Sequence, residues 1–263
     1  MAIIPLSAQN TSGRRSFPVI NTLLILANIA VFVYEVVQGP AFATCLTNAY
    51  ALVPTDVLQN TSHATGCALS EPHPVALTLL TSLFLHASWL HVGGNMLYLW
   101  VFGGQVEGRL GHLRYLFFYL LCGVVASAAQ IAFSIYASQT TILTLGASGA
   151  IAGVLGAYLI FFPGSKVRSV FLIGIVPVPL RLWAFIVIGL FIVLQIVEGY
   201  LEVLSITSGQ QQSSGGVAFF AHIGGFLLGV LVALGAKLGG GTKNLKGSTS
   251  YPSSPPHRDW RTA

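Results

Sequence analysis

Charged residues are scarce in this sequence. Only 7% of the 263 residues are Asp, Glu, Lys or Arg, and 54% are hydrophobic. A soluble globular domain carries about 25% charged residues. The shortage of charge excludes an ordinary soluble domain and indicates a membrane protein.

The hydrophobic residues form long runs, without the alternating pattern that predicts a membrane β-barrel. Runs of about 16 to 22 residues are long enough, or nearly so, to cross about 30 Å of hydrocarbon as helices. We interpret the first run as a retained anchor, because it is long for a cleaved signal peptide. The sequence therefore predicts an all-α membrane protein with six spans, at residues 19–37, 90–107, 113–134, 148–162, 182–199 and 217–236.

The twelve basic residues outnumber the seven acidic ones, but their positions favour a membrane topology over a nucleic-acid-binding surface. With six spans and a cytoplasmic N-terminus, all twelve basic residues fall on the cytoplasmic side. The positive-inside rule therefore predicts that both termini are cytoplasmic. We expect no nucleic-acid partner. The lack of a mitochondrial-type presequence favours a bacterial plasma membrane.

The chain divides into a cytoplasmic segment at residues 1–17, a helical domain at 18–237 and a tail at 238–263. The tail is rich in Gly, Ser, Thr and Pro, which predicts disorder. Cysteine is scarce, but Cys45 and Cys67 both fall in a long outer segment, and we predict a disulfide between them. The apolar stretch 170–179 is too short to cross, so we predict that it lies at the inner membrane interface.

Acidic residues are absent between Glu107 and Glu198. The two aspartates of the chain lie outside the predicted spans, which excludes an intramembrane protease that uses two aspartates. His86 and His91 are five residues apart and do not share a helical face as a zinc-binding histidine pair would. We therefore expect no metal and no cofactor. Four histidines are interpreted as loop, interface or tail residues: His63, His73, His112 and His257.

The predicted fourth helix is short for a membrane span. It extends from Ser148 to Phe162, where Pro163 and Gly164 end it. Fifteen residues give about 22 Å at 1.5 Å per residue. Ser148 is therefore expected below the outer boundary, where irregular backbone is tolerated only inside protein or beside a water-filled cavity.

Other polar residues are predicted at the same depth as Ser148. His222 and Asn95 lie about 22 and 21 Å from the inner ends of their helices, and His91 lies about one turn higher than Asn95. An ionisable residue in the hydrocarbon region is a functional candidate by default. Depth does not fix rotation about the helix axes, so the sequence leaves open whether Ser148 and His222 face each other.

Glycines near these residues predict close helix packing. Gly149 and Gly153 form one pair four residues apart, and Gly225 and Gly229 form another. Such pairs let the fourth and sixth helices approach closely. Gly146, together with Gly149, suits a tight turn into the membrane.

The types of these residues predict nucleophilic catalysis. A serine hydroxyl becomes an effective nucleophile when a base within hydrogen-bond reach takes its proton, and histidine suits that role near neutral pH. No buried carboxylate is available to orient His222, so a Ser-His dyad is favoured over a triad. The Asn95 amide, the Ser148 backbone N–H and the His91 ring are candidate donors to an oxyanion.

Four motifs occur in order within residues 18–237. They are His91-Val92-Gly93-Gly94-Asn95, Glu107-Gly108-Arg109 followed by Gly111, Gly146-Ala147-Ser148-Gly149, and Ala221-His222-Ile223-Gly224-Gly225 followed by Gly229. Together they resemble the rhomboid family of intramembrane serine proteases. The resemblance implies a six-transmembrane-helix rhomboid-like bundle with a gate for sideways entry of a substrate segment.

The same resemblance implies roles for single residues. Ser148 would be the nucleophile, His222 the general base, and Asn95 and His91 parts of the oxyanion hole. Glu107 and Arg109 would belong to a structural motif at the inner end of the second span.

Two positions depart from the family pattern. Residues 75–78 read Val-Ala-Leu-Thr, where many relatives carry a Trp-Arg pair in the first outer loop. Ala152 stands one turn after Ser148, where some relatives have an aromatic that stacks on the histidine. The sequence therefore does not identify what holds His222.

The favoured function is an intramembrane serine endopeptidase that cleaves transmembrane segments of membrane proteins near the outer face. Its partners would be transmembrane protein substrates and the lipid bilayer. The alternative is a catalytically silent rhomboid-like protein that binds membrane clients, but such relatives usually lack the serine or the histidine. A small transporter would need broken helices in repeated halves, which the sequence does not show. Substrate identity and oligomeric state are not predicted.

Overall fold

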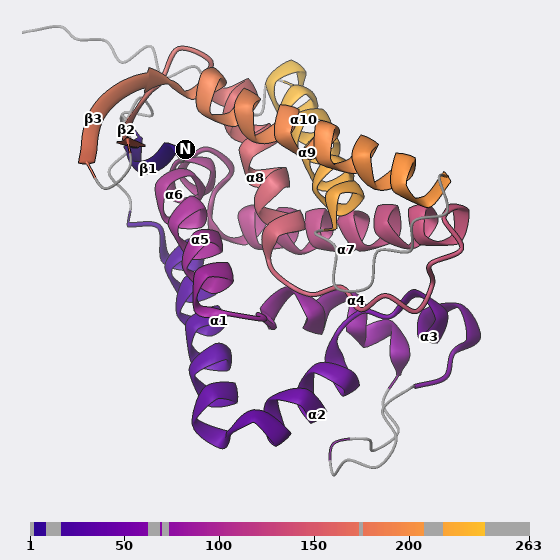
Figure 1. Cartoon of the computed structure of the whole chain (residues 1–263). Helices are drawn as coiled ribbons and strands as arrows, with labels where there is room; N and C mark the ends of the chain where they lie inside the picture. Colours follow the sequence, from indigo (N-terminus) through magenta and orange to yellow (C-terminus); the bar gives the residue numbers. More distant parts are fainter. Residues whose placement is uncertain are drawn as a thin grey trace, which may run out of the picture.

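The computed structural model describes residues 3–8, 17–62, 69, 74–173, 176–207 and 218–239. This part of the chain is mostly helical, which confirms the predicted all-α class, and it also contains one small sheet (Figure 1). The helices of the bundle are α1 (Val19–Gln38), α5 (Trp89–Tyr98), α6 (Gly104–Leu110), α7 (His112–Tyr136), α8 (Ser148–Phe161), α9 (Ala184–Thr207) and α10 (Phe219–Leu238). The helices between α1 and α5 are α2 (Pro40–Tyr50), α3 (Pro54–Gln59), η1 (Val75–Leu77), α4 (Thr78–Thr81) and η2 (Ser82–Phe84), and the strands are β1 (Ile3–Ala8), β2 (Lys166–Ile173) and β3 (Val176–Trp183).

Six helical segments lie where the hydrophobic runs predicted them. The second is α5 and α6 joined by a π-helical turn, η3 (Leu99–Gly103). Within the described residues, α1, α7, α10 and the 184–201 part of α9 are long and apolar enough to cross a membrane, and a pair bent by 82°, residues 75–84 with 89–110, would add a fifth crossing. The count of six crossings stays a prediction, because α8 has only 14 residues.

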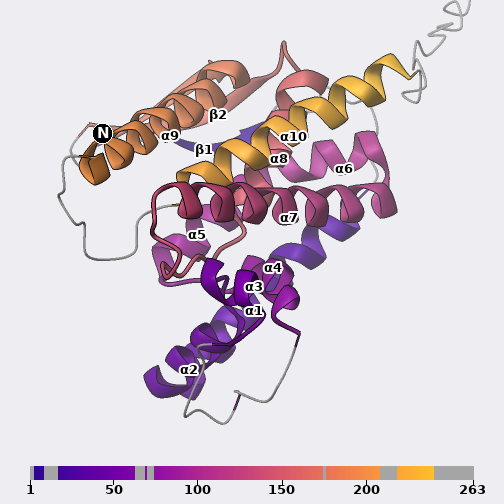
Figure 2. The same ribbon diagram turned by 90° about the vertical axis from the view of Figure 1, so that its right-hand side faces the viewer.

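Helix α8 lies at the centre of the bundle. Its residues are small or apolar on every side, which is typical of a fully surrounded helix, and ten of its 14 residues are buried, from Gly149 to Tyr158. It packs between α7 and α10 (Figure 2). The start of α8 is therefore held in place by two neighbouring helices.

Contact between α8 and α10 is backbone to backbone. A Cβ atom added to Gly225 would lie 2.0 Å from the carbonyl oxygen of Gly149, and one added to Gly229 would lie 1.9 Å from that of Gly153. On α8 itself, the space beside Gly149 and Gly153 is filled by α7, because added Cβ atoms would lie 2.5 Å from Ala126 Cβ and 2.4 Å from Cys122 Sγ. Only glycine allows approaches this close.

The sheet was not predicted. Strands β1, β2 and β3 pair antiparallel in that order, so the N-terminal segment joins the hairpin formed by the 166–183 region. Within the stretch 170–179, expected only to lie at the interface, residues 170–173 pair with residues 176–179. The sheet lies at one end of the molecule, and α2, α3 and α4 lie at the other (Figure 1).

The segment between α1 and α5 contains short helices and is tied to the loop before α8. Leu52 and Thr144 exchange two backbone hydrogen bonds, of 2.9 and 2.8 Å. Cys45 is disulfide-bonded, but Cys67 lies outside the described residues, so its pairing with Cys45 stays a prediction. Most of the predicted disordered tail, residues 240–263, also lies outside the described residues.

Candidate active site

A glycine turn leads the chain into α8. Gly146 has a φ of +115°, a conformation that favours glycine, and its N–H donates to the Ser82 carbonyl at 2.8 Å. A Cβ atom at Gly146 would lie 2.7 Å from His91 Nε2, so the ring of His91 occupies the space that glycine leaves. The turn places Ser148 as the first residue of the helix.

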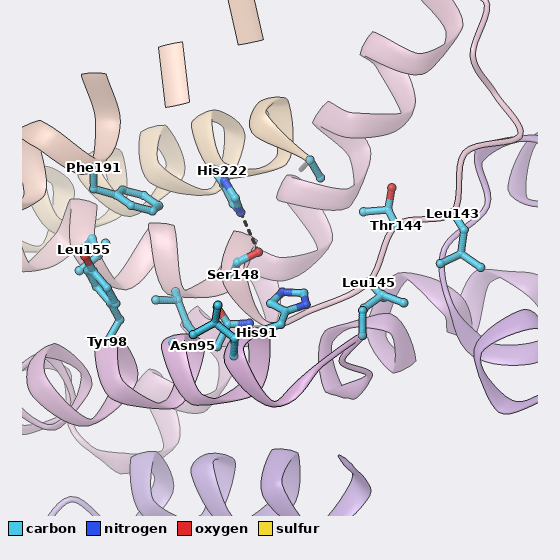
Figure 3. A pocket seen from close by; sticks show the side chains of 15 residues that line it. His91, Asn95, Tyr98, Leu143, Thr144, Leu145, Ser148, Leu155, Phe191 and His222 are labelled. Carbon is cyan, nitrogen blue, oxygen red and sulfur yellow. Dashed lines mark hydrogen bonds between the residues drawn. The ribbon is translucent and has the colours of Figure 1, made fainter. Parts of the chain in front are cut away.

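Ser148 and His222 face each other. His222 Nε2 lies 2.7 Å from Ser148 Oγ, a hydrogen-bond distance, and the two side chains come from α8 and α10 (Figure 3). His222 is buried, with 4% of its surface exposed, whereas Ser148 is half-buried. Helices α8 and α10 are therefore rotated about their axes so that the Ser148 hydroxyl contacts the His222 imidazole. The sequence had left this rotation open.

The other ring nitrogen of His222 contacts α9. His222 Nδ1 hydrogen bonds to Gln195 Oε1, and the ring of Phe191 lies 5.8 Å from the His222 ring, centroid to centroid. An amide oxygen only accepts, so Nδ1 carries the proton and Nε2 accepts from the serine hydroxyl. Ala152, at the position of the aromatic in some relatives, is fully buried and has no ring to offer.

Gln195 and Phe191 were missed in the sequence because the search for an orienting group covered only carboxylates. The sequence does contain a signal for Gln195. Gln195 is the one polar residue between positions 184 and 197, and polar residues inside membrane helices are functional candidates. Phe191 lies one turn earlier on the same helix, so the two share a face.

Asn95 and His91 lie beside the serine, on α5 (Figure 3). A Cβ atom on Gly146 would lie 3.6 Å from Asn95 Nδ2, so the amide borders the turn that leads to Ser148. Asn95 Nδ2 also contacts His86 Nε2 at 3.0 Å. Because an amide has two N–H donors, this contact orients Asn95 and leaves the second donor free to face the cavity. His86, given no role in the sequence, is thus in contact with a candidate oxyanion donor.

A cavity of about 510 Å³ is lined by the candidate site residues Ser148, His222, Asn95, His91 and Phe191. Its walls come from α5, α8, α9, the start of α10 and residues 143–145 of the loop before α8. Tyr98 of α5 and Phe191 of α9 face each other across one side, with ring centroids 6.0 Å apart. The cavity is mostly apolar with a few convergent polar groups, which is typical of a ligand site.

Glu107 lies at the other end of the second helical segment. Its carboxylate accepts hydrogen bonds from the backbone N–H groups of Ile20 and Asn21, at 3.0 and 2.7 Å, and it also pairs with His112 Nδ1. It therefore satisfies donors that the first turn of α1 would otherwise leave unpaired. The guanidinium of Arg109 stands 5.9 Å over the ring of Phe161. Both residues are remote from the cavity and tie α6 to α1 and α8.

No group of three or more His, Cys, Asp or Glu side chains that could hold a metal ion occurs in the part of the chain that the structure describes. His63, His73 and His257 lie outside that part. His112, interpreted as a loop, interface or tail residue, is half-exposed at the start of α7, and its ring hydrogen bonds to Glu107.

The sequence is similar to those of known proteins. Mitochondrial rhomboid protein 1 of Saccharomyces cerevisiae is 30% identical over 156 residues, which cover 59% of this chain and 40% of that protein. The human mitochondrial presenilin-associated rhomboid-like protein is 30% identical over 155 residues, 57% of this chain and 35% of that protein. Rhomboid protease GlpG of Yersinia pestis (strain Pestoides F) is 29% identical over 153 residues, 57% of this chain and 44% of that protein.

The chain thus spans less than half the length of each of these relatives. The Rhomboid domain profile matches residues 74–237, from the short helices before α5 almost to the end of α10. The matched region contains Asn95, Ser148 and His222. The chain belongs to the rhomboid family of membrane proteins.

Proposed function

We propose that this chain is an intramembrane serine endopeptidase that cleaves transmembrane segments of membrane proteins near the outer face. The observation that carries the proposal is the 2.7 Å contact between Ser148 Oγ and His222 Nε2 inside a cavity of about 510 Å³. Nucleophile and base within hydrogen-bond reach are the signature of covalent catalysis by serine. One relative bears the name rhomboid protease, which also supports this reaction.

The proposed reaction has two halves. Ser148 Oγ attacks the carbonyl carbon of the scissile peptide bond while its proton passes to His222 Nε2. The protonated ring then gives that proton to the leaving amine as the C–N bond breaks, which leaves an acyl-serine ester. Water, deprotonated by the same nitrogen, hydrolyses the ester and restores both side chains.

Donors beside Ser148 would stabilise the oxyanion of the tetrahedral intermediate. The first N–H groups of a helix have no intrahelical partner, so the backbone N–H of Ser148 is available at the start of α8. Asn95 Nδ2 and His91 Nε2 both border the Gly146 turn next to it. Loss of one such donor typically lowers turnover by about 100-fold or more.

A substrate segment would reach the serine between α5 and α9. Tyr98 and Phe191 close that side of the cavity with their rings, so parting them would open a path from the surrounding lipid. The distribution of basic residues supports cytoplasmic termini, which would place the α2–α4 end of the molecule, and the cavity near it, toward the outer face.

Covalent labelling tests the proposal without a known substrate. The purified full chain in detergent is incubated with a fluorophosphonate, and adduct formation is followed for the wild type, Ser148→Ala and His222→Ala. We expect one adduct on Ser148 in the wild type and none in either variant. Absence of an adduct from a wild type shown to be folded by its thermal transition would refute the proposal and favour the client-binding alternative.

A further inference from the structure

The orientation of His222 depends on α9. The buried ring makes one contact with Ser148, and its remaining hydrogen bond goes to Gln195 on α9. Phe191, one helical turn before Gln195, lies tilted at 48° against the same ring. On α8, Ala152 stands where some relatives have an aromatic, and it has no ring to stack on an imidazole.

The burial of the Gln195 amide in α9 carries a free-energy cost. Gln195 is 7% exposed, and its neighbours on α9 are apolar. A buried amide inside a membrane helix destabilises the protein unless its polar atoms are paired. The pairing with His222 removes this cost for the amide oxygen, and it ties the two side chains into one unit.

We propose that Gln195 is the positioning residue of the dyad, which holds His222 in the tautomer that leaves Nε2 free to accept the Ser148 proton. This rests on the proposed function of Ser148 and His222. An oxygen facing Nδ1 requires a hydrogen there, and a neutral imidazole carries one hydrogen, so Nε2 keeps its lone pair. If the ring adopted the other tautomer, Nε2 would carry the hydrogen and could not act as a base.

An amide suits this position better than the carboxylate of a soluble triad. A carboxylate buried in an apolar bundle carries a large desolvation penalty, whereas an amide provides the same acceptor geometry without net charge. The orienting group is therefore a neutral amide, and the dyad needs no buried acid beside it. Phe191 adds a second support, because its ring limits the swing of the imidazole about its Cβ–Cγ bond.

Two substitutions of Gln195 separate the acceptor from the rest of the side chain. Gln195→Leu keeps the bulk and removes the acceptor, and Gln195→Glu keeps an acceptor oxygen at the same length. Val193→Leu changes a side chain of α9 that is 54% exposed and serves as the matched control. If the leucine variant does not fold, Gln195→Met, with an unbranched chain of the same length, takes its place.

The readouts are the rate of fluorophosphonate labelling of Ser148 and the ¹⁵N chemical shifts of the His222 ring, assigned by difference from His222→Ala. We expect Gln195→Leu to label about 10- to 100-fold more slowly and to show a mixture of tautomers. We expect Gln195→Glu to recover most of the labelling rate. We expect Val193→Leu to match the wild type in both readouts, with the hydrogen of the His222 ring on Nδ1.

Equal labelling rates and the same single tautomer in wild type and Gln195→Leu would overturn the positioning role while leaving the proposed function intact. Slow labelling in a folded Gln195→Glu whose His222 ring keeps the wild-type tautomer would also overturn it, because the tautomer would then not be what sets the rate. Failure of the wild type itself to label would instead refute the proposed function.

Discussion

Helices α10 and α9 both hold His222, but they do so in different ways. Helix α10 carries the residue and meets α8 through backbone contacts that only glycine permits. Helix α9 meets the ring with two side chains, and many of its other large side chains are exposed. The α8–α10 contact therefore sets the distance between Ser148 and His222, whereas α9 sets the direction in which the ring points. Substitutions in the first contact should act mainly on stability, and those in the second mainly on activity.

The largest effect is expected at Gly229. A Cβ atom there would lie 1.9 Å from the Gly153 carbonyl oxygen, so α8 and α10 must move apart in Gly229→Ala. Overpacking lowers the free energy of unfolding by about 1 to 3 kcal/mol and occasionally more. We expect a loss at the upper end of this range, because the clashing atom belongs to the backbone and cannot move aside as a side chain can. The free energy of unfolding in detergent measures this loss, and labelling of Ser148 should fall with it.

Gly235 provides the control on the same helix. An added Cβ atom meets nothing within 4 Å there, so Gly235→Ala should be neutral or stabilising by up to about 1 kcal/mol through helix propensity. If the two alanine variants were equally stable, the close contact between α8 and α10 would not exist in the folded protein.

A smaller effect, and one on activity alone, is expected at Phe191. Removal of its ring in Phe191→Ala leaves the imidazole less restricted, and aromatic contacts of this kind contribute about 0.5 to 1.5 kcal/mol. We therefore expect labelling of Ser148 to slow by about 2- to 10-fold while the thermal transition shifts little. Leu194→Ala, on the exposed side of α9, should leave the labelling rate unchanged. A large loss of stability with an unchanged labelling rate in Phe191→Ala would contradict the view that contacts of α9 act mainly on activity and those of α10 mainly on stability.

The smallest effect is expected where α9 meets α10. A Cβ atom on Gly199 would lie 3.4 Å from Phe219 Cβ, an ordinary contact distance. Gly199→Ala should therefore change the free energy of unfolding by less than about 1 kcal/mol, with helix propensity favouring the alanine. Calorimetry of this variant beside Gly229→Ala measures the contrast. A penalty as large as that at Gly229 would show that α9 is packed as tightly as α10.

Much of the architecture could be predicted because the membrane imposes it. Long apolar runs must be helical when no water is available to the backbone, and the described helices begin and end within a few residues of the predicted spans, except that α9 extends further. The helical rise of 1.5 Å per residue predicted a common depth for Ser148, His222 and Asn95. In the structure, all three residues line one cavity.

The sheet and the partner of His222 were not predicted, for two different physical reasons. Pairing of β1 with β2 joins residues more than 150 positions apart, such as Ile4 with Val170, and no local pattern specifies such a contact. Strand β3 also contains Pro177 and Pro179, which argue against a strand when only the sequence is read. Gln195 carried a readable signal, but its contact with His222 depends on how α9 is rotated, and the otherwise apolar stretch 184–197 does not reveal that rotation.

Cleavage in a bilayer tests the central claim most directly. The full chain is reconstituted in liposomes with a single-span polypeptide that carries helix-destabilising glycines near one end of its hydrophobic segment, and the products are identified by mass. We expect the wild type to cut within that segment close to the outer boundary, and Ser148→Ala to yield no product. Cleavage that persists in Ser148→Ala, or a wild type that labels on Ser148 yet cuts no membrane segment, would contradict the account.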